Sequence, residues 1–303
     1  LAQTYPLPDG RRLHLYRRRF TPPQEEDLAY YQALMADLTK QAQPGDAVVL
    51  SPPEQVYALA RYGDGSLTYY PWPTEARTIT EEDLAALEQL GAGQDRLWLV
   101  YGPSGANDPG SLLAPWLAER FYRAGDAWYG SLQLVLFGPP GEAGTSISPE
   151  AAGSGLAEWE NGISLQRIGL VEDTLQLGQI VRLELLWQAA EPVQERYKVF
   201  VHLLGPEGQV VAQRDSEPVD GTRPTTSWQR GEPIADSYGL WLPADLPAGD
   251  YRLVAGLYHA ETGDRVPVCC PPADAVPLAI IRVEGDRARI LDPRAGILAP
   301  DGN

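Results

Sequence analysis

The chain has 303 residues, of which 44% are hydrophobic and 21% charged, and this size is sufficient for two globular cores. Its formal net charge of −17 argues against a nucleic-acid partner, because a phosphate backbone is bound through clustered Lys and Arg. No stretch approaches the run of roughly 18 apolar residues that a membrane span needs. The chain begins at Leu1 and its only methionine is Met35, so we expect a processed or excised piece of a longer product.

Helical and strand patterns alternate up to about residue 138. "TPPQ" has the form of a capping box and precedes apolar residues at helical spacing, and "TEEDLAALEQLG" predicts a second capped helix ending at Gly91. A third helix is expected to start at Asp108-Pro109 and to reach Phe121. The predicted strands between these helices are "PGDAVVL", "SLTYYPW", "RLWLVYG" and "SLQLVLFGPP". This alternation predicts a small, mostly parallel α/β sheet domain of Rossmann-like type over residues 1–138.

The pattern changes after a segment rich in Gly, Pro, Ser and Ala, residues 139–158, which is typical of a linker. About seven short strands follow over residues 159–285, separated by Gly, Pro and Asp turns. Such a series predicts an immunoglobulin-like β-sandwich. We expect residues 286–303 to form a loosely attached tail. The sequence thus predicts α/β plus all-β architecture in two domains.

Signals for a cofactor or metal site are missing from the sequence. A Rossmann site needs glycines at its first strand-to-helix turn, where this chain has "LSPPEQ", and Gly105–Ser111 lacks the lysine of a phosphate-binding loop. The adjacent Cys269 and Cys270 have no second cysteine pair, and the three histidines lack zinc-binding spacing. We therefore expect no cofactor and no metal. His202 lies in an apolar strand, which favours a packed histidine over a catalytic base.

The stretch "RPTTSWQRGEPIADSY" at 223–238 holds the candidate ligand-contact residues. Exposed aromatic rings beside polar side chains can stack on sugars, whereas glycoside hydrolysis needs two placed carboxylates. A calcium site and plain solvated surface are further readings of these acidic residues. In the structural alternative, Trp228 fills one end of the core, and Thr225, Thr226 and Asp236 bond backbone groups where strands end. The predicted carbohydrate-contact set is Trp228, Arg230, Glu232, Asp236, Tyr238 and Asp215.

Five arginines gather in the segment "RRLHLYRRRF" near the start of the chain. Beside a membrane they could bind anionic lipid headgroups. Alternatively, they pair with the protein's own excess of carboxylates. Both readings stay open for Arg11, Arg12, Arg17, Arg18 and Arg19.

Several segments together resemble a known family. The strand segments "VFVHLL", "AQRD" and "GLY", the loop pattern "PT..W..GE.I.D" and "LPADLPAGDYRL" are similar to a β-sandwich domain of bacterial membrane glycosyltransferases. These belong to the protein-mannosyltransferase-like (GT-C) class, notably in Chloroflexi-type bacteria. "PGDAVVL", "RLWLVYG" and "APWLAERFYRAGDAWYGSLQLVLF" look like the α/β segment of the same enzymes, so the resemblance covers most of residues 25–268.

The resemblance implies a polytopic enzyme that uses a lipid-phosphate-linked sugar, with its catalytic acidic residues in a membrane region absent from this sequence. No catalytic residue is therefore carried over to this chain. The expected function is that of a non-catalytic extracytoplasmic accessory region at the cell membrane, which positions the acceptor glycan or protein. Its expected partner is the membrane-embedded remainder of the same polypeptide. A carbohydrate-binding module or secreted binding protein is the alternative, and an independent hydrolase is a third.

Overall fold

A computed structural model shows a chain built mostly of β-strands in several sheets. It divides into two compact units, the first comprising Leu1–Trp116 with Asp126–Pro139 and the second Leu117–Gly125 with Pro140–Asn303. The structure describes residues 3–6, 12–15, 25–59, 62, 67–73, 78–102, 108, 112–141, 145–147, 156–269 and 271–292.

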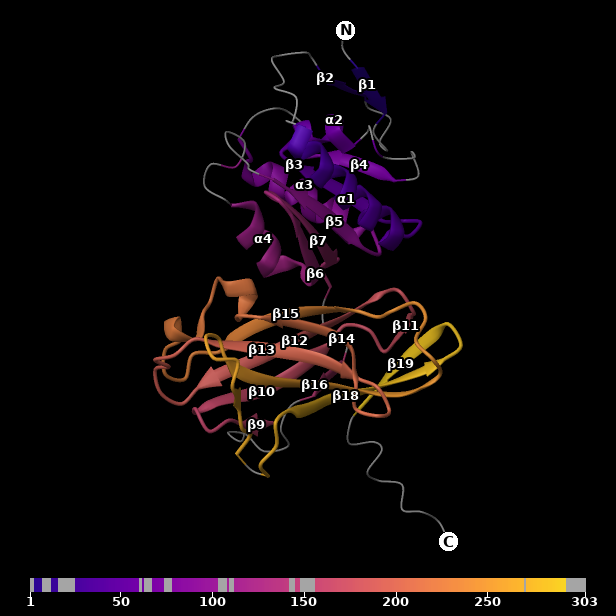
Figure 1. Ribbon diagram of the computed structural model, residues 1–303. Coiled ribbons are helices and arrows are strands. Elements are labelled where there is room, and N and C mark those ends of the chain that lie inside the picture. The colour runs from indigo at the N-terminus through magenta and orange to yellow at the C-terminus, as the bar shows by residue number, and fades with distance from the viewer. Residues whose placement is uncertain are drawn as a thin grey trace. The chain divides into compact units, whose positions relative to one another are not determined.

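The first unit combines helices with a five-stranded sheet of order β4-β3-β5-β7-β6 (Figure 1). The strands of this sheet are β3 (Ala47–Ser51), β4 (Thr68–Pro71), β5 (Leu97–Tyr101), β6 (Tyr122–Tyr129) and β7 (Leu132–Gly138), of which residues 122–125 of β6 are counted with the second unit. The helices are α1 (Glu25–Gln41), the 3-10 turn η1 (Pro53–Gln55), α2 (Val56–Leu59), α3 (Glu81–Ala92) and α4 (Leu113–Arg120), of which residues 117–120 of α4 are counted with the second unit. A separate two-stranded sheet pairs β1 (Gln3–Pro6) with β2 (Arg12–Leu15).

The predicted capped helix is confirmed as α3. Thr80 is its N-cap, and the backbone N–H of Asp83 donates to the Thr80 hydroxyl over 3.4 Å. In return the Asp83 carboxylate accepts from the Thr80 backbone N–H over 2.9 Å, which completes a capping box. The helix ends at Ala92, one residue beyond the predicted glycine. The "TPPQ" capping signal lies outside the described residues.

The sheet is mixed, which corrects the expectation of a mostly parallel one. β3 runs parallel to β4 and β5, but β7 is antiparallel to β5. The reason is a strand that the sequence reading overlooked: α4 ends at Arg120, and β6 then turns back into β7 through a two-residue connection at 130–131. A hairpin reverses the chain, whereas a helical crossover would have kept the strands parallel. Asp108 lies before α4 and accepts from the backbone N–H groups of Leu112 and Leu113.

A buried ion pair connects the starts of the neighbouring strands β3 and β5, since Asp46 immediately precedes β3 and Arg96 immediately precedes β5. Arg96 has 1% of its surface exposed and donates to both carboxylate oxygens of Asp46, over 2.9 and 2.6 Å. Asp46 also accepts from the indole N–H of Trp98 over 2.8 Å, and Arg96 donates to the carbonyl of Gln41, the last residue of α1. Two strands and one helix end are thus fixed by one charged pair.

The second unit is a β-sandwich-like body of two antiparallel sheets with one shared core (Figure 1). Burial alternates along its strands, as period-2 side-chain packing requires, and the indoles of Trp159 and Trp187 meet in the core with centroids 5.4 Å apart. One sheet contains β8 (Thr145–Ile147), β9 (Ala157–Glu158), β10 (Ile163–Leu170), β12 (Ile180–Ala189) and β15 (Ile234–Trp241). The other contains β11 (Thr174–Gln176), β13 (Tyr197–Leu204), β14 (Val210–Ser216), β16 (Gly249–His259), β17 (Arg265–Val266), β18 (Val276–Glu284) and β19 (Arg287–Leu291).

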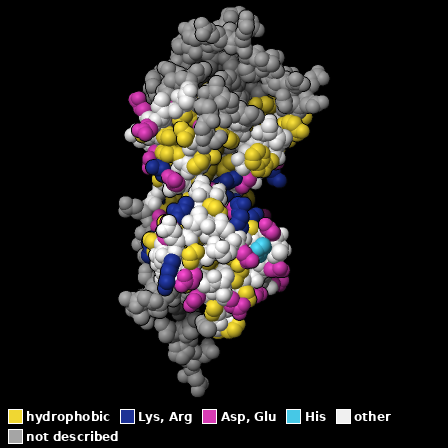
Figure 2. Space-filling view, turned by 90° about the vertical axis from the view of Figure 1, so that its left-hand side faces the viewer, with side chains coloured by type: hydrophobic (Ala, Val, Ile, Leu, Met, Phe, Trp, Pro, Cys, Tyr) yellow, Lys and Arg dark blue, Asp and Glu magenta, His cyan; other side chains and the backbone are white. Residues whose placement is uncertain are grey.

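Acidic and basic side chains lie beside one another on the face of the molecule that Figure 2 presents. Ion pairs of the sandwich follow this mixing, with Arg196 joined to Glu217 and Arg182 joined to Glu172. Arginines of this acidic chain therefore do pair with its own carboxylates. The predicted arginine cluster near the start of the chain is a separate matter, because the side chains of Arg11, Arg12, Arg17, Arg18 and Arg19 lie outside the described residues.

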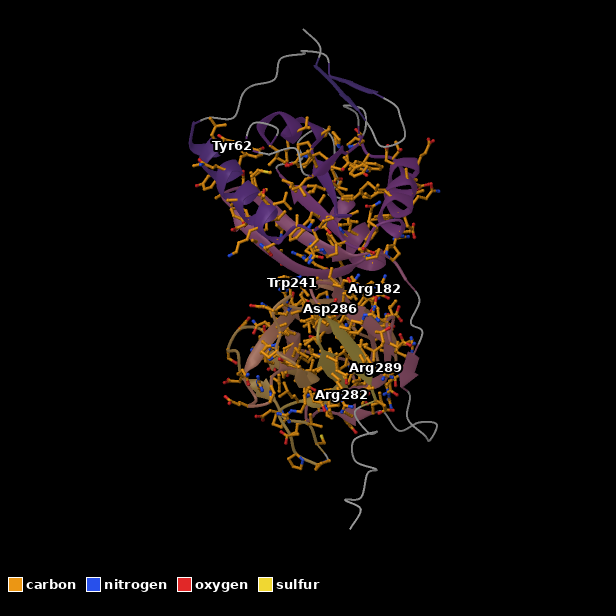
Figure 3. All side chains as sticks on the ribbon, turned by 90° about the vertical axis from the view of Figure 1, so that its right-hand side faces the viewer. Tyr62, Arg182, Trp241, Arg282, Asp286 and Arg289 are labelled. Atoms are coloured by element: carbon orange, nitrogen blue, oxygen red, sulfur yellow. The ribbon has the colours of Figure 1, made fainter. Side chains whose placement is uncertain are left out.

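The expected linker and tail both contribute strands. β8 and β9 fall within residues 139–158 and pair with β10. β19 falls within residues 286–303 and pairs with β18, where Arg282 and Arg289 are opposite each other in the register (Figure 3). The guanidinium of Arg282 also binds the carboxylate of Asp250 on β16 through two hydrogen bonds. Gly285, with φ of 66°, lies in the turn between β18 and β19, where glycine adopts a left-handed conformation without steric cost.

We expect Asp46→Ala to destabilise the first unit by about 3–5 kcal/mol, because it leaves the Arg96 guanidinium buried without its carboxylate. The double variant Asp46→Leu/Arg96→Met should lose less, since no unpaired charge remains. Urea denaturation of both variants measures this. A single variant as stable as the wild type would contradict the role of the pair.

Candidate functional site

The residues predicted to contact carbohydrate lie in or beside the segment that connects β14 to β15. This segment, residues 217–233, contains two short 3-10 turns, η2 (Val219–Gly221) and η3 (Thr225–Ser227). We call it the β14–β15 loop. It does not gather the six predicted residues into one site; three of them are buried, two lie on the surface, and Asp215 belongs to another cluster.

Trp228 is part of the sandwich core, with 2% of its surface exposed. Its indole N–H donates to the carbonyl of Arg223 over 3.0 Å, which satisfies the ring's one polar group. A sugar could not stack on a ring that is covered in this way. The burial supports the structural alternative, in which Trp228 fills one end of the core.

Thr225 ties the β14–β15 loop to the start of β13. Its hydroxyl accepts from the backbone N–H of Tyr197 over 3.0 Å and donates to the carbonyl of Glu195 over 2.6 Å. Thr225 is fully buried, so its bond with the Tyr197 N–H is shielded from water. The prediction that its hydroxyl bonds backbone groups at a strand end is confirmed.

Asp236 is a buried carboxylate that holds the other end of the loop. One oxygen accepts from the backbone N–H of Val219 over 2.8 Å, and the other accepts from the Tyr238 hydroxyl over 2.7 Å. Burial is the main cause that raises the pKa of Asp236 to about 7, partly opposed by these hydrogen bonds and reinforced by the charge of Asp220. Burial also raises the pKa of the Tyr238 hydroxyl.

The backbone that Asp236 holds is strained. Val219 and Asp220 have φ angles of 52° and 50°, in the left-handed region that β-branched residues in particular avoid. Each such residue costs about 1–3 kcal/mol, and it persists where its surroundings fix it. Here the fixing contacts are the Val219–Asp236 hydrogen bond and the ion pair of Asp220 with Arg214 at 2.5 Å.

Arg230 and Glu232 form the surface of the loop. Glu232 binds Arg223 over 2.7 Å and accepts from the backbone N–H of Gln229, and the bond with Arg223 is the main cause that lowers the pKa of Glu232. Arg230 lies 3.5 Å from Glu191, and both side chains are largely exposed. These are the predicted residues that a ligand in solvent could reach.

Asp215 joins a cluster on the outer face of the β13–β14–β16 sheet. One of its carboxylate oxygens lies 3.1 Å from Nε2 of His202, which is 8% exposed and packs on Phe200 with ring centroids 4.7 Å apart. Burial, followed by the nearby Asp215 carboxylate, raises the pKa of Tyr258 to about 12. The prediction of a packed, hydrogen-bonded His202 is confirmed.

The sequence reading overlooked Tyr258 as a member of this cluster. The signal that could have found it is strand alternation, since Phe200 and His202 share one face of β13, and Gly256 and Tyr258 share one face of β16. In this cluster the Asp215 carboxylate orients the His202 imidazole and the Tyr258 phenol. The guanidinium of Arg265 packs over the ring of Phe200, 4.5 Å from its centroid.

Within the described residues, no group of three or more His, Cys, Asp and Glu side chains is placed to hold a metal ion. In the same part of the chain, no helix is long and apolar enough to cross a bilayer. Cys269 is partly buried, and Cys270 lies outside the described residues.

Comparison with known proteins identifies no family. No family model and no curated protein matches the chain. Among solved structures, the C-terminal domain of Wzt shares 14% identity with a TM-score of 0.31, covering 51% of this chain and 92% of its own. A Bacteroides uniformis β-glucuronidase 2 calcium-binding mutant shares 12% identity with a TM-score of 0.28, and the alignment spans 52% of this chain but 16% of the enzyme. A Listeria innocua β-glucosidase in complex with gluconolactone shares 13% identity with a TM-score of 0.23, over 82% of this chain and 49% of the enzyme. Likenesses this weak carry no argument about function.

We expect Trp228→Ala to cost about 3–5 kcal/mol of the free energy of unfolding, as for other buried tryptophans. Arg230→Ala, two residues away on the surface, is the matched control and should change stability by less than about 0.5 kcal/mol. Chemical denaturation of both variants gives the comparison. Equal, small effects would show that the indole is not a core residue.

The raised pKa of Asp236 predicts a pH-dependent stability. Between its ordinary pKa of 3.8 and about 7, the folded protein keeps a proton on Asp236 that the unfolded chain releases. The stabilisation is therefore complete below pH 3.8 and is lost as pH rises through about 7, with a slope of roughly 1.4 kcal/mol per pH unit in that window.

Asp236→Asn removes the titrating group but keeps an oxygen for the Val219 N–H. The difference in unfolding free energy between wild type and variant, measured by urea denaturation across this window, should change with that slope. A pH-independent difference would show that Asp236 titrates normally.

Proposed function

We propose that this chain is a non-catalytic accessory region of a bacterial membrane glycosyltransferase that uses a lipid-linked sugar donor. In this proposal a Rossmann-like α/β domain precedes an immunoglobulin-like sandwich, and both lie on the extracytoplasmic face of the cell membrane. Their partner is the membrane-embedded remainder of the same polypeptide. Their role is to position the acceptor glycan or protein.

The observation that carries the proposal is that the segments similar to the glycosyltransferase family contact one another in the structure. Asp46 of "PGDAVVL" and Arg96 of "RLWLVYG" form the buried ion pair of the first unit. In the second unit, Asp215 of "AQRD" binds His202 of "VFVHLL". Gly256 of "GLY" leaves room for the ring of Phe200 from "VFVHLL", since a Cβ at that position would approach the ring within 2.3 Å.

The loop pattern "PT..W..GE.I.D" fits the same account. Its Thr225, Trp228 and Asp236 are all buried and bonded to backbone groups of the sandwich. The pattern is thus accounted for by folding, and it leaves its residues no evident catalytic task. Such a pattern supports a shared accessory module, with the reaction performed elsewhere in the parent protein.

A carbohydrate-binding module or secreted binding protein is the second candidate. It is favoured by the tryptophan on β6, Trp128, because an indole with 64% exposure presents both an apolar ring and a polar N–H to a ligand.

The test is to express the complete reading frame in membranes and to measure sugar transfer from a lipid-linked donor, with and without the region 25–292. We expect several apolar spans of about 20 residues upstream. We also expect transfer to the natural acceptor to fall on deletion of the region, and no turnover by the purified chain alone. An upstream sequence without spans, or turnover by the isolated chain, would refute the proposal.

A further inference from the structure

Trp128 is the most exposed large apolar side chain in the described part of the protein, at 64%. It lies near the end of β6, which is the edge strand of the five-stranded sheet. Neighbouring Tyr129 points to the opposite face, where its hydroxyl donates to Asp37 of α1 over 2.5 Å. Helix α1 therefore contacts the face that Trp128 does not occupy.

Two polar side chains share the face of Trp128. Asp126 is two residues earlier on β6 and so points to the same side of the sheet. The turn at 130–131 is a two-residue hairpin connection, which places Gln133 of β7 opposite Trp128. The amide of Gln133 donates to the Asp126 carboxylate over 3.1 Å, which links two side chains of the face that carries the indole.

This face of the sheet is covered over the inner strands and open at its edge. Val135 of β7 and Leu99 of β5 lie opposite each other on it, and both are buried. Asp126 and Trp128 on β6 are exposed. Among the described residues, the edge strand is therefore more exposed than the inner strands, with Trp128 and Asp126 exposed and Gln133 half-buried.

We propose that Trp128, Asp126 and Gln133 form a binding platform for a neutral sugar ring of a glycan. The indole offers a flat apolar surface for the C–H face of a pyranose. A carboxylate has two oxygens that accept hydrogen bonds and an amide both donates and accepts, which suits adjacent hydroxyl groups. The chain's net charge of −17 disfavours phosphorylated or acidic sugars.

This platform lies on the α/β part of the chain and is separate from the β14–β15 loop. It goes beyond the proposed function, because a purified chain could bind a glycan whether or not it derives from a glycosyltransferase. Failure of the platform would leave the accessory role untouched, since the role is tested by transfer in membranes.

The experiment is saturation-transfer NMR on the whole chain, with mannotriose and cellotriose as neutral probes and a glucuronic acid disaccharide as the acidic probe. We expect millimolar binding of at least one neutral probe and weaker binding of the acidic one. Trp128→Ala should weaken binding at least tenfold, Gln133→Ala should weaken it less, and Trp128→Phe should restore part of it.

Val210→Ala is the matched control, since Val210 is an apolar side chain with 47% exposure on a strand of the sandwich. It should leave binding unchanged, and thermal unfolding should be the same for the Trp128 variants as for wild type. Absence of binding of every neutral probe at millimolar concentration would overturn the proposal. Binding that survives Trp128→Ala, or self-association in sedimentation that Trp128→Ala abolishes, would overturn it as well.

Discussion

The buried carboxylate of Asp236 is the contact on which the arrangement of the sandwich loop depends. A carboxyl group without exposure loses its hydration, and this loss must be offset by hydrogen bonds within the protein. Asp236 has two, from the Val219 backbone and the Tyr238 hydroxyl. The bond to Val219 and the ion pair of Asp220 with Arg214 hold these two residues in a left-handed conformation. The loop then runs to Thr225 and Trp228, which are both buried. The polar and aromatic side chains of this loop therefore stabilise the fold.

A similar division holds in the α/β unit. The Asp46–Arg96 pair is buried and fixes strand ends, whereas the groups available to a ligand stand at the edge strand around Trp128. Buried charged and aromatic residues thus stabilise the fold, whereas exposed ones are available to a ligand. This division agrees with the proposed accessory role, in which buried polar contacts build rigid bodies and exposed side chains are left for recognition.

Much of the fold could be predicted from the sequence, and the reasons for the failures are specific. The helix after Thr80 was predictable because its cap is local, and the strands of the sandwich were predictable from alternating apolar residues. The hairpin of β6 and β7 was not, because Trp128 and Tyr129 continue an apolar pattern that also suits the end of a helix. The tail strand β19 was missed although Gly285-Asp286 is a two-residue hairpin turn that joins it to β18 and could have been recognised; only its pairing with β11 is distant in sequence.

The candidate site shows the same limit. The sequence around Trp228 is compatible with an exposed sugar-binding tryptophan and with a buried core tryptophan. Burial decides between the two, and it cannot be read from the local sequence. Amide hydrogen exchange at Val219 and Tyr197 tests the account most directly, because these two N–H groups are bonded to Asp236 and Thr225. Protection comparable to that of the β13 and β16 amides is the predicted result. Exchange as fast as in a solvent-exposed loop would contradict it.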